Sequence, residues 1–240
     1  INLLIFCTML TKPPQEEIES RKVNLGPQTC SKLLILDMDE TLPTQGSTKL
    51  HAKKTPLKLE SKRMRMVSRV QHPDLQQAQS AANDTPQRQI KTASGGGAPI
   101  LGQMFELCVF TAGEQDYADA ILNYIDPDRS LIKTGSTGSI AFAAPGVYVK
   151  DLSIIADRQL KDIIIVDNSI ISFAFNLSNG IPIKAFLGNK QDEELLFMVT
   201  YLEELFSKAD VRTHIDSTFK LQEFQESTIG TGSSQMTKTK

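Results

Sequence analysis

Three short apolar runs, each ending in a polar residue, constrain the fold of this chain more than any other feature. They are Leu33–Asp37 (LLILD), Leu107–Thr111 (LCVFT) and Ile163–Asp167 (IIIVD). Runs of this length without alternation, bounded by polar residues, are typical of strands buried on both faces, as in a parallel sheet. A fourth run, Ile183–Phe186, is a further candidate strand. The chain is therefore expected to build a sheet that is covered on both sides.

The segments between these runs carry the periodicity of helices. Residues 117–125 have an apolar face and are followed by Pro127, and a second helix is expected over Asp151–Gln159. The strongest helical pattern is Gln191–Lys208, which combines an apolar stripe with acidic residues in its first turn. Strands that alternate with helices predict an α/β domain with a Rossmann-like parallel sheet flanked by helices.

The distribution of aromatic residues divides the chain into an ordered part and flanking parts. All four tyrosines and eight of the eleven phenylalanines lie within residues 105–206, whereas residues 43–102 contain no aromatic residue. That stretch is rich in Gln, Ser, Ala and Gly, so a poorly ordered low-complexity insertion is expected there. The predicted organisation is an N-terminal segment, a domain that contains the insertion, and a flexible tail, over 1–30, 31–215 and 216–240.

Composition excludes several classes of function. A net charge of −2 and a pI of about 6.0 give no global attraction to nucleic acid or anionic membranes. Three distant cysteines and three scattered histidines indicate neither a disulfide framework nor a zinc site, so an intracellular setting is expected.

The apolar residues 1–10 are too few to span a bilayer, so a short packed segment is expected unless an anchor precedes Ile1. A basic run over 49–69 fits a solvated linker or, alternatively, a nuclear localisation patch.

Chemistry concentrates in the segment LLILDMDETL, residues 33–42, where a strand runs into Asp37 and Asp39 follows after one residue. The carboxyl ends of parallel strands meet at one edge of a sheet, so these carboxylates are expected to share a crevice with Thr111 and Asp167. One carboxylate can then attack as a nucleophile while the other transfers protons. Because carboxylates repel a phosphate dianion, the arrangement requires a cation, and Mg²⁺ prefers such oxygen ligands.

Four segments in order resemble the motifs of the haloacid dehalogenase (HAD) superfamily of phosphotransferases. They are DMDET, VFTAG, YVKDL and IIVDNS, at residues 37–41, 109–113, 148–152 and 164–169. The segments around them resemble one branch, the small phosphatases that act on the C-terminal domain of RNA polymerase II, with their nuclear-envelope relatives. This resemblance covers 31–42 and 103–215 and implies a HAD-like, FCP-like homology domain.

The resemblance implies a role for each motif residue. Asp37 would attack the phosphoryl group and become an aspartyl-phosphate. Asp39 would protonate the leaving oxygen and then deprotonate the water that hydrolyses the intermediate. Thr111 and Lys150 would bind the phosphate, and Thr41 would order the phosphate-binding loop.

The same resemblance implies a cofactor, a substrate and a location. Mg²⁺ would be held by Asp37, the main-chain carbonyl of Asp39, and Asn168, with Asp167 acting through water or orienting that shell. The implied activity is hydrolysis of phosphoserine or phosphothreonine in a protein, with the RNA polymerase II C-terminal domain as a candidate substrate and no nucleic-acid partner. The implied location is the nucleus or nuclear envelope, with the cytoplasm as the alternative.

Two segments depart from the pattern of that branch. Residues 43–102 stand where the family continues its first motif, and residues 130–146 are a reduced form of the insert that contacts the phosphopeptide. The catalytic motifs are therefore complete, whereas the substrate-contacting surface is short. Two alternatives follow: a non-catalytic binding module on the same fold, like the mitochondrial import-receptor relatives, or a phosphatase of small phosphate esters. The sequence carries no indication of oligomeric state.

Overall fold

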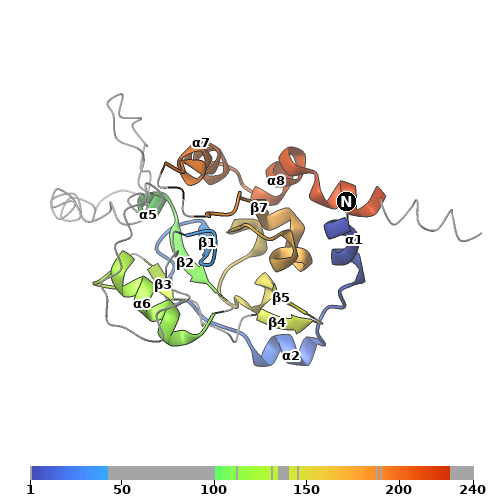
Figure 1. Ribbon diagram of the computed structural model, residues 1–240, viewed down its shortest axis with the longest axis horizontal. Helices are drawn as coiled ribbons and strands as arrows, with labels where there is room; N and C mark the ends of the chain where they lie inside the picture. Colours follow the sequence, from blue (N-terminus) through green and yellow to red (C-terminus); the bar gives the residue numbers. More distant parts are fainter. Residues whose placement is uncertain are drawn as a thin grey trace, which may run out of the picture.

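Five parallel strands form the centre of the molecule (Figure 1). The computed structural model describes residues 2–42, 101–111, 113–130, 132–134, 141–144, 146–187, 189 and 191–227. The strands are β1 (Leu33–Asp37), β2 (Glu106–Phe110), β3 (Ile132–Thr134), β6 (Ile163–Asp167) and β7 (Gly180–Pro182). Their order is β3-β2-β1-β6-β7, with every neighbouring pair parallel. The order reverses between β1 and β6, the position at which open α/β sheets bind ligands.

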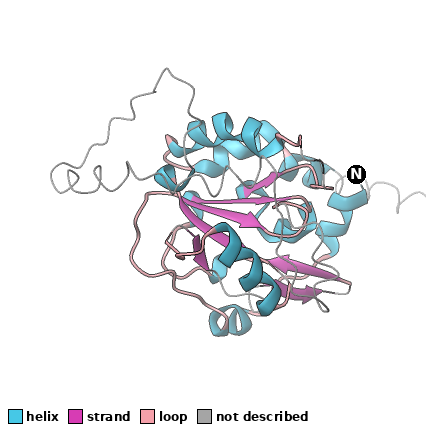
Figure 2. Cartoon of the chain, turned by 60° about the vertical axis from the view of Figure 1, so that its left-hand side comes forward, coloured by secondary structure: helices cyan, strands magenta, loops and turns pink. Residues whose placement is uncertain are grey.

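Alternate side chains of β1 point to opposite faces of the sheet, and each face has its own core. Leu34 and Leu36 pack on one face against a layer of helices. That layer consists of α5 (Leu101–Met104), α6 (Gln115–Ile125), α7 (Glu194–Phe206) and α8 (Val211–Phe219). Leu33 and Ile35 pack on the other face. The expected parallel sheet flanked by helices is confirmed (Figure 2).

The second face is covered mainly by short helical turns and a hairpin. These elements are α2 (Gln15–Ser20), β4 (Ala141–Ala144), η2 (Leu152–Ile154) and η4 (Ile170–Asn179). β4 pairs antiparallel with β5 (Val147–Lys150), which carries Lys150 toward the carboxyl edge of the sheet. The hairpin and the turns thus complete the second layer and bring a cation to the end of β1.

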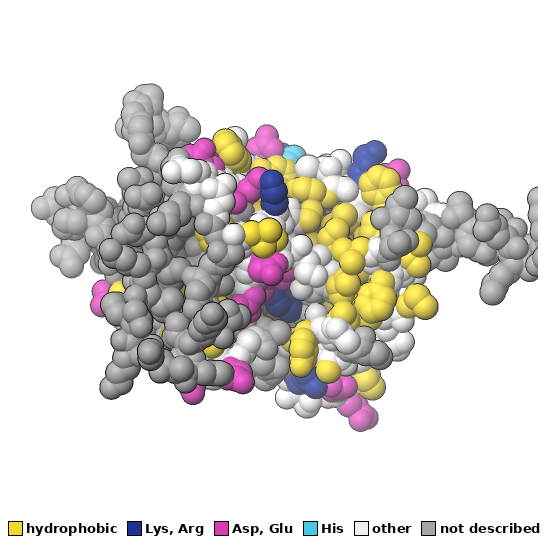
Figure 3. All heavy atoms as spheres, in the orientation of Figure 1, with side chains coloured by type: hydrophobic (Ala, Val, Ile, Leu, Met, Phe, Trp, Pro, Cys, Tyr) yellow, Lys and Arg dark blue, Asp and Glu magenta, His cyan; other side chains and the backbone are white. Residues whose placement is uncertain are grey.

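The apolar N-terminal residues form the short helix α1 (Asn2–Met9), which packs beside η4. Its Cys7 is buried against Val149 and Ala174. Apolar side chains gather over α1 and η4 on the face shown in Figure 3. The expectation of a short packed segment is confirmed. Within the described ranges, no helix is long and apolar enough to cross a membrane.

The predicted helix over Asp151–Gln159 is wrong. Only the single 3-10 turn η2 forms, and Asp151 caps it by accepting a hydrogen bond from Ser153 N at 2.9 Å. The chain then pairs with the N-terminal segment: Val23 N donates to Ile154 O and Ala156 N donates to Val23 O, both at 2.9 Å. Those backbone groups cannot also serve a helix, so long-range pairing overrides the local pattern.

The predicted strand over Ile183–Phe186 is also misplaced. The strand in this part of the chain is β7, which ends at Pro182, just before the predicted range. Gly180 begins β7, and a Cβ there would lie 2.0 Å from the ring of Phe173, so only glycine fits this packing. Ile183 N still donates to Asp167 O at 3.1 Å, and the chain leaves the sheet after this residue. Phe186 N instead donates to Glu40 O at 2.5 Å, which ties the segment to the loop after β1.

The ordered part of the chain extends beyond the limits that the sequence predicts. A flexible tail is expected from residue 216, but α8 continues to Phe219 and 221–227 is also helical, with Leu221 buried. Leu101 lies in the expected insertion over 43–102, yet it is buried in the core. Residues 43–100, which include the basic run over 49–69, and residues 228–240 at the end of the tail lie outside the described residues.

Candidate active site

Three charged side chains meet at the carboxyl edge of the sheet, and we call them the carboxyl-edge cluster: Asp37, Lys150 and Asp167. Asp37 ends β1, Asp167 ends β6 and Lys150 ends β5. Lys150 Nζ donates to Asp37 Oδ1 and to Asp167 Oδ2, the latter at 2.7 Å. All three are buried, with 6%, 4% and 1% of Asp37, Lys150 and Asp167 exposed. On the face shown in Figure 3, acidic and basic side chains meet in a central hollow.

The carboxyl-edge cluster holds more acid than base. Burial is the largest influence on Asp37 and raises its pKa; Lys150 opposes this, but Asp167 adds to the rise, and the pKa reaches about 7. Burial acts to lower the pKa of Lys150, but the two carboxylates outweigh it, so that pKa is raised and the ammonium stays protonated. Two buried carboxylates therefore share one ammonium, and the cluster favours a further positive charge.

The loop after β1 turns Asp39 toward solvent. Glu40 has a φ of 58°, in the left-handed region, which costs a non-glycine residue about 1–2 kcal/mol. The hydrogen bond from Phe186 N to Glu40 O holds this turn in place. Asp39 is exposed, whereas Asp37 is buried two residues earlier. The two carboxylates thus occupy different environments.

Two hydroxyl groups hold the exposed carboxylate of Asp39. Thr111 Oγ1, just beyond the end of β2, donates to Asp39 Oδ2 at 3.1 Å. The hydroxyl of Tyr117, in the first turn of α6, donates to Asp39 Oδ1 at 2.9 Å. Gly113 N in turn donates to Thr111 Oγ1 at 2.9 Å. Each oxygen of Asp39 therefore accepts from a different side chain.

A second set of hydrogen bonds joins the β1 loop to the end of β6. Asn168 N donates to Thr41 Oγ1 at 3.2 Å, and Thr41 Oγ1 donates to Asn168 Oδ1 at 3.3 Å. Asn168 Nδ2 donates to Glu40 Oε2 at 3.1 Å. Because Glu40 engages the amide nitrogen, the amide oxygen of Asn168 is directed away from it. Thr41, which is fully buried, therefore links the loop after β1 to the residue that follows β6.

The oxygen atoms at this edge suit a hard divalent cation. Asp37 and Asp167 supply carboxylates and Asn168 an amide oxygen, which are ligands that Mg²⁺ prefers. Ser169 N donates to Asp167 Oδ1 at 2.8 Å and orients that carboxylate. In the described part of the chain, no three His, Cys, Asp or Glu side chains are grouped to hold a metal. The donor chemistry and the excess of acid both fit Mg²⁺.

The structure brings the seven sequence-predicted site residues to one edge of the sheet, in three contacting groups. The groups are Asp37 with Lys150 and Asp167, Asp39 with Thr111, and Thr41 with Asn168. Sequence reasoning missed Glu40 and Tyr117. Tyr117 carried a signal only as part of the apolar face of α6, and Glu40 carried no signal apart from its place between Asp39 and Thr41.

A different charge cluster, centred on a buried carboxylate, lies at the amino edge of the sheet, where β2 begins. We call Glu106, Lys133 and Arg158 the amino-edge cluster. Glu106 accepts hydrogen bonds from Arg158 Nε at 2.7 Å, Arg158 Nη2 at 3.0 Å and Lys133 Nζ at 2.6 Å. Burial acts to raise the pKa of Glu106, but the hydrogen bonds from Arg158 and Lys133 outweigh it and lower that pKa to about 2.

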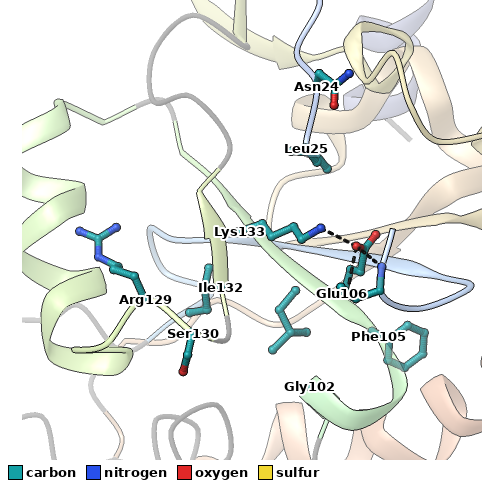
Figure 4. A pocket seen from close by; sticks show the side chains of 11 residues that line it. Asn24, Leu25, Gly102, Phe105, Glu106, Arg129, Ser130, Ile132 and Lys133 are labelled. Carbon is teal, nitrogen blue, oxygen red and sulfur yellow. Dashed lines mark hydrogen bonds and ion pairs between the residues drawn. The ribbon is translucent and has the colours of Figure 1, made fainter. Parts of the chain in front are cut away.

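The amino-edge cluster borders a pocket of about 490 Å³ between β2, β3 and the N-terminal segment. Figure 4 shows Lys133 directed toward Glu106 in this pocket, whereas Arg129 points away from it. Arg129 is bonded instead to Asp119 and Asn123. Since the cations beside the pocket already have carboxylate partners, its charges are balanced within the chain.

Comparison with known proteins assigns the chain to a family. The family described as NLI interacting factor-like phosphatase matches residues 32–212. "CTD small phosphatase-like protein 2" of Dictyostelium discoideum is 41% identical over 121 residues, 50% of this chain and 21% of that protein. "CTD nuclear envelope phosphatase 1B" of Danio rerio is 32% identical over 114 residues, 48% of this chain and 46% of that protein. The chain thus spans less than half the length of either relative.

A solved structure of the fission yeast RNA polymerase II CTD phosphatase Fcp1, bound to beryllium fluoride, aligns with 84% of this chain and 56% of that chain. Its TM-score is 0.36 and its sequence identity 16%. The family match covers β1, β2, β5 and β6, and therefore every strand that ends at the carboxyl-edge cluster. The chain belongs to the NLI interacting factor-like phosphatase family.

Proposed function

We propose that this protein is a Mg²⁺-dependent phosphatase that hydrolyses phosphoserine or phosphothreonine in proteins through an aspartyl-phosphate intermediate on Asp37. The observation that carries the proposal is the carboxyl-edge cluster, in which two buried carboxylates share Lys150 at the topological switch point of the sheet. A structural ion pair would have equal numbers of opposite charges, as the amino-edge cluster does once Asp157, which also contacts Arg158, is counted.

In the first half of the proposed reaction, an oxygen of Asp37 forms a bond to phosphorus while the bond from phosphorus to the serine or threonine oxygen breaks. Asp39 gives its proton to that leaving oxygen. The ammonium of Lys150, which contacts Asp37, stabilises the negative charge that spreads over the transferred group. Thr111 lies beside Asp39, where its hydroxyl can also donate to a phosphate oxygen.

In the second half, water attacks the phosphorus of the aspartyl-phosphate, and Asp39 takes up the proton that this water loses. The bond between Asp37 and phosphorus breaks, so inorganic phosphate leaves and both aspartates return to their starting states. Bound Mg²⁺ would neutralise charge on the phosphate and on Asp37. Asp37, the main-chain carbonyl of Asp39 and Asn168 would hold it, and Asp167 would orient or bridge that shell.

The relatives support a substrate and a location for this activity. Their names refer to the CTD and to the nuclear envelope. We extend the proposal to a phosphorylated segment of the RNA polymerase II C-terminal domain as a candidate substrate, and to the nucleus or nuclear envelope as the location. We also assign the catalytic domain to residues 31–215, which is close to the family match over 32–212.

Hydrolysis of p-nitrophenyl phosphate and of a phosphoserine peptide tests the proposal. The wild-type chain, Asp37→Asn and the surface control Asp128→Asn should be assayed at mildly acidic pH with Mg²⁺ or with EDTA. We expect turnover that requires Mg²⁺, is lost in Asp37→Asn and is retained in Asp128→Asn. A folded wild-type chain without turnover on either substrate would contradict the proposal and favour a binding module. Turnover of the small ester alone would favour a small-ester phosphatase.

A further inference from the structure

The hydroxyl of Tyr117 donates a hydrogen bond to Asp39 but has no role in the proposed reaction as described above. Among the side chains that the structure describes, two donate to the Asp39 carboxylate: Thr111 at 3.1 Å and Tyr117 at 2.9 Å. A threonine hydroxyl carries one hydrogen, so it donates to one acceptor at a time. When Thr111 donates to a substrate phosphate, as the proposed reaction requires, Tyr117 is the donor that remains on Asp39.

Asp39 needs such a donor because it is exposed on a loop. An exposed aspartate has several accessible rotamers, and a proton-transfer group has to lie within hydrogen-bond distance of its target. Tyr117 is suited to restrict the rotamers of Asp39 because its ring is partly buried. The ring packs against the core on the face of the sheet that the α5–α8 layer covers. Its backbone belongs to the first turn of α6, and the next residue, Ala118, is fully buried. The hydroxyl is therefore presented from a rigid element.

The backbone at Gly113 provides independent support for this arrangement. A Cβ at that position would lie 3.1 Å from Thr111 Oγ1, 3.2 Å from Tyr117 Cδ1 and 3.7 Å from Asp39 Oδ2. Gly113 thus packs without a side chain against Thr111 Oγ1 and the ring of Tyr117, beside the carboxylate of Asp39. A Cβ at this position would press on both residues that donate to Asp39.

We propose that Tyr117 is a positioning residue, which holds the Asp39 carboxylate in the orientation needed for proton transfer to the leaving serine or threonine oxygen. This inference rests on the proposed function, because it assigns Tyr117 to the same reaction. The inference predicts that loss of the Tyr117 hydroxyl affects substrates differently, according to whether their leaving group needs a proton. A serine alkoxide needs a proton as it leaves, whereas p-nitrophenolate leaves readily without one.

The test is Tyr117→Phe, which keeps the ring and removes only the hydroxyl. We expect kcat/KM for a phosphoserine peptide to fall by at least about tenfold, and kcat/KM for p-nitrophenyl phosphate to fall by less than about threefold. In the Asp39→Asn background the same substitution should cause no further loss with the peptide, because the group that it positions is already absent. Tyr201→Phe is the matched control, since its hydroxyl bonds to Thr218 on the α8 side of the molecule.

Gly113→Ala is a second variant, which crowds the ring of Tyr117 without changing that residue. Because the new Cβ would also lie 3.1 Å from Thr111 Oγ1, we expect kcat/KM to fall for both substrates, and to fall further for the phosphoserine peptide. The inference would be overturned if Tyr117→Phe lowered kcat/KM equally for both substrates. It would also be overturned if Tyr117→Phe had an undiminished effect in the Asp39→Asn background. Either result would leave the phosphatase activity established. A folded wild-type chain that hydrolyses neither substrate would overturn the proposed function, and with it this inference.

Discussion

The two buried charge clusters of the sheet differ in how completely their charges are paired. At the carboxyl edge, Asp37 and Asp167 share the single ammonium of Lys150. At the amino edge, Glu106 receives hydrogen bonds from two cations, Lys133 and Arg158. Both clusters contain carboxylates at the ends of strands of the five-stranded sheet, and these carboxylates (Asp37, Asp167 and Glu106) are all buried, so burial alone does not distinguish the two clusters.

The difference appears in the direction of the pKa shifts. Burial and the neighbouring acids raise the pKa of Asp37 to about 7, whereas Arg158 and Lys133 lower the pKa of Glu106 to about 2. A carboxylate that is stabilised as an ion strengthens the fold, and one that is destabilised as an ion weakens it. We infer that the amino-edge cluster holds the structure together, whereas the carboxyl-edge cluster retains a charge imbalance that a bound cation relieves.

The largest expected effect is that of Lys150→Met, which removes the one cation of the carboxyl-edge cluster. Asp37 and Asp167 would then be buried without a cation, so we expect a loss of about 3 kcal/mol in unfolding free energy at pH 8. Turnover should fall by at least about a thousandfold, since the charge on the transferred group loses its stabilising ammonium. Urea unfolding and p-nitrophenyl phosphate assays measure the two quantities. Unchanged stability would show that the acids do not depend on Lys150.

Glu106→Gln tests the other side of the comparison. The substitution keeps the shape of the side chain but leaves Arg158 and Lys133 without their shared carboxylate, although Arg158 retains Asp157. We expect a loss of about 2–3 kcal/mol in unfolding free energy, with little change in kcat for the folded protein. Urea unfolding provides the measurement, and Glu114→Gln, at an exposed position, is the matched control. A loss of kcat without a loss of stability would reverse the assignment of roles.

Asp37→Asn should have the opposite effect on stability. Because Lys150 keeps Asp167 as a partner, removing the charge of Asp37 balances the carboxyl-edge cluster. We expect the metal-free protein to gain about 1–2 kcal/mol in unfolding free energy at pH 8, while its turnover is lost. Thermal unfolding in EDTA measures this gain. A destabilised Asp37→Asn protein would indicate that the Asp37–Lys150 pair contributes more to stability than the charge imbalance costs.

The sequence predicted the sheet better than its connections. β1 and β6 coincide with continuous apolar runs, which indicate buried strands whatever their neighbours are. The 3-10 turn at 152–154 was not predictable, because it depends on pairing with Val23, more than 100 residues away in the chain. β7 was missed because it begins with Gly180 and ends with Pro182, two residues that usually argue against a strand.

Contacts between residues that are far apart in the chain also limited the prediction of the site. Asp37, Thr111 and Asp167 were predictable because polar residues at the ends of parallel strands converge by topology alone. Lys150 and Asn168 were predicted only through the resemblance to the family's motifs. Tyr117 and Glu106 were not, since the sequence pattern assigns Tyr117 to a helix face and Glu106 to the start of a strand. Their partners are 78 and 52 residues away, at Asp39 and Arg158, and only the folded chain brings these groups together.

The smallest expected effect is the pH dependence of these differences, and it has opposite signs at the two edges. The pKa of Glu106 is lowered from 4.5 to about 2, so its stabilisation is lost as pH falls through that window. The pKa of Asp37 is raised from 3.8 to about 7, so its ionisation costs stability as pH rises through that window.

Unfolding in EDTA as a function of pH measures both effects. The difference in unfolding free energy by which the wild type exceeds Glu106→Gln should shrink by about 1 kcal/mol from pH 4.5 to pH 3. The advantage of Asp37→Asn over the wild type should grow by a similar amount from pH 4.5 to pH 7. Shifts of the same sign would contradict the comparison.

Mg²⁺ titration of unfolding free energy tests most directly the claim that the carboxyl edge, and not the amino edge, is built to receive a cation. The wild type, Glu106→Gln and Asp37→Asn should each be unfolded with urea across a range of Mg²⁺ concentrations at pH 8. We predict that Mg²⁺ stabilises the wild type and Glu106→Gln by the same amount, about 2.7 kcal/mol at a hundred times the Kd, and stabilises Asp37→Asn far less. Equal stabilisation of all three proteins, or of none, would contradict the claim.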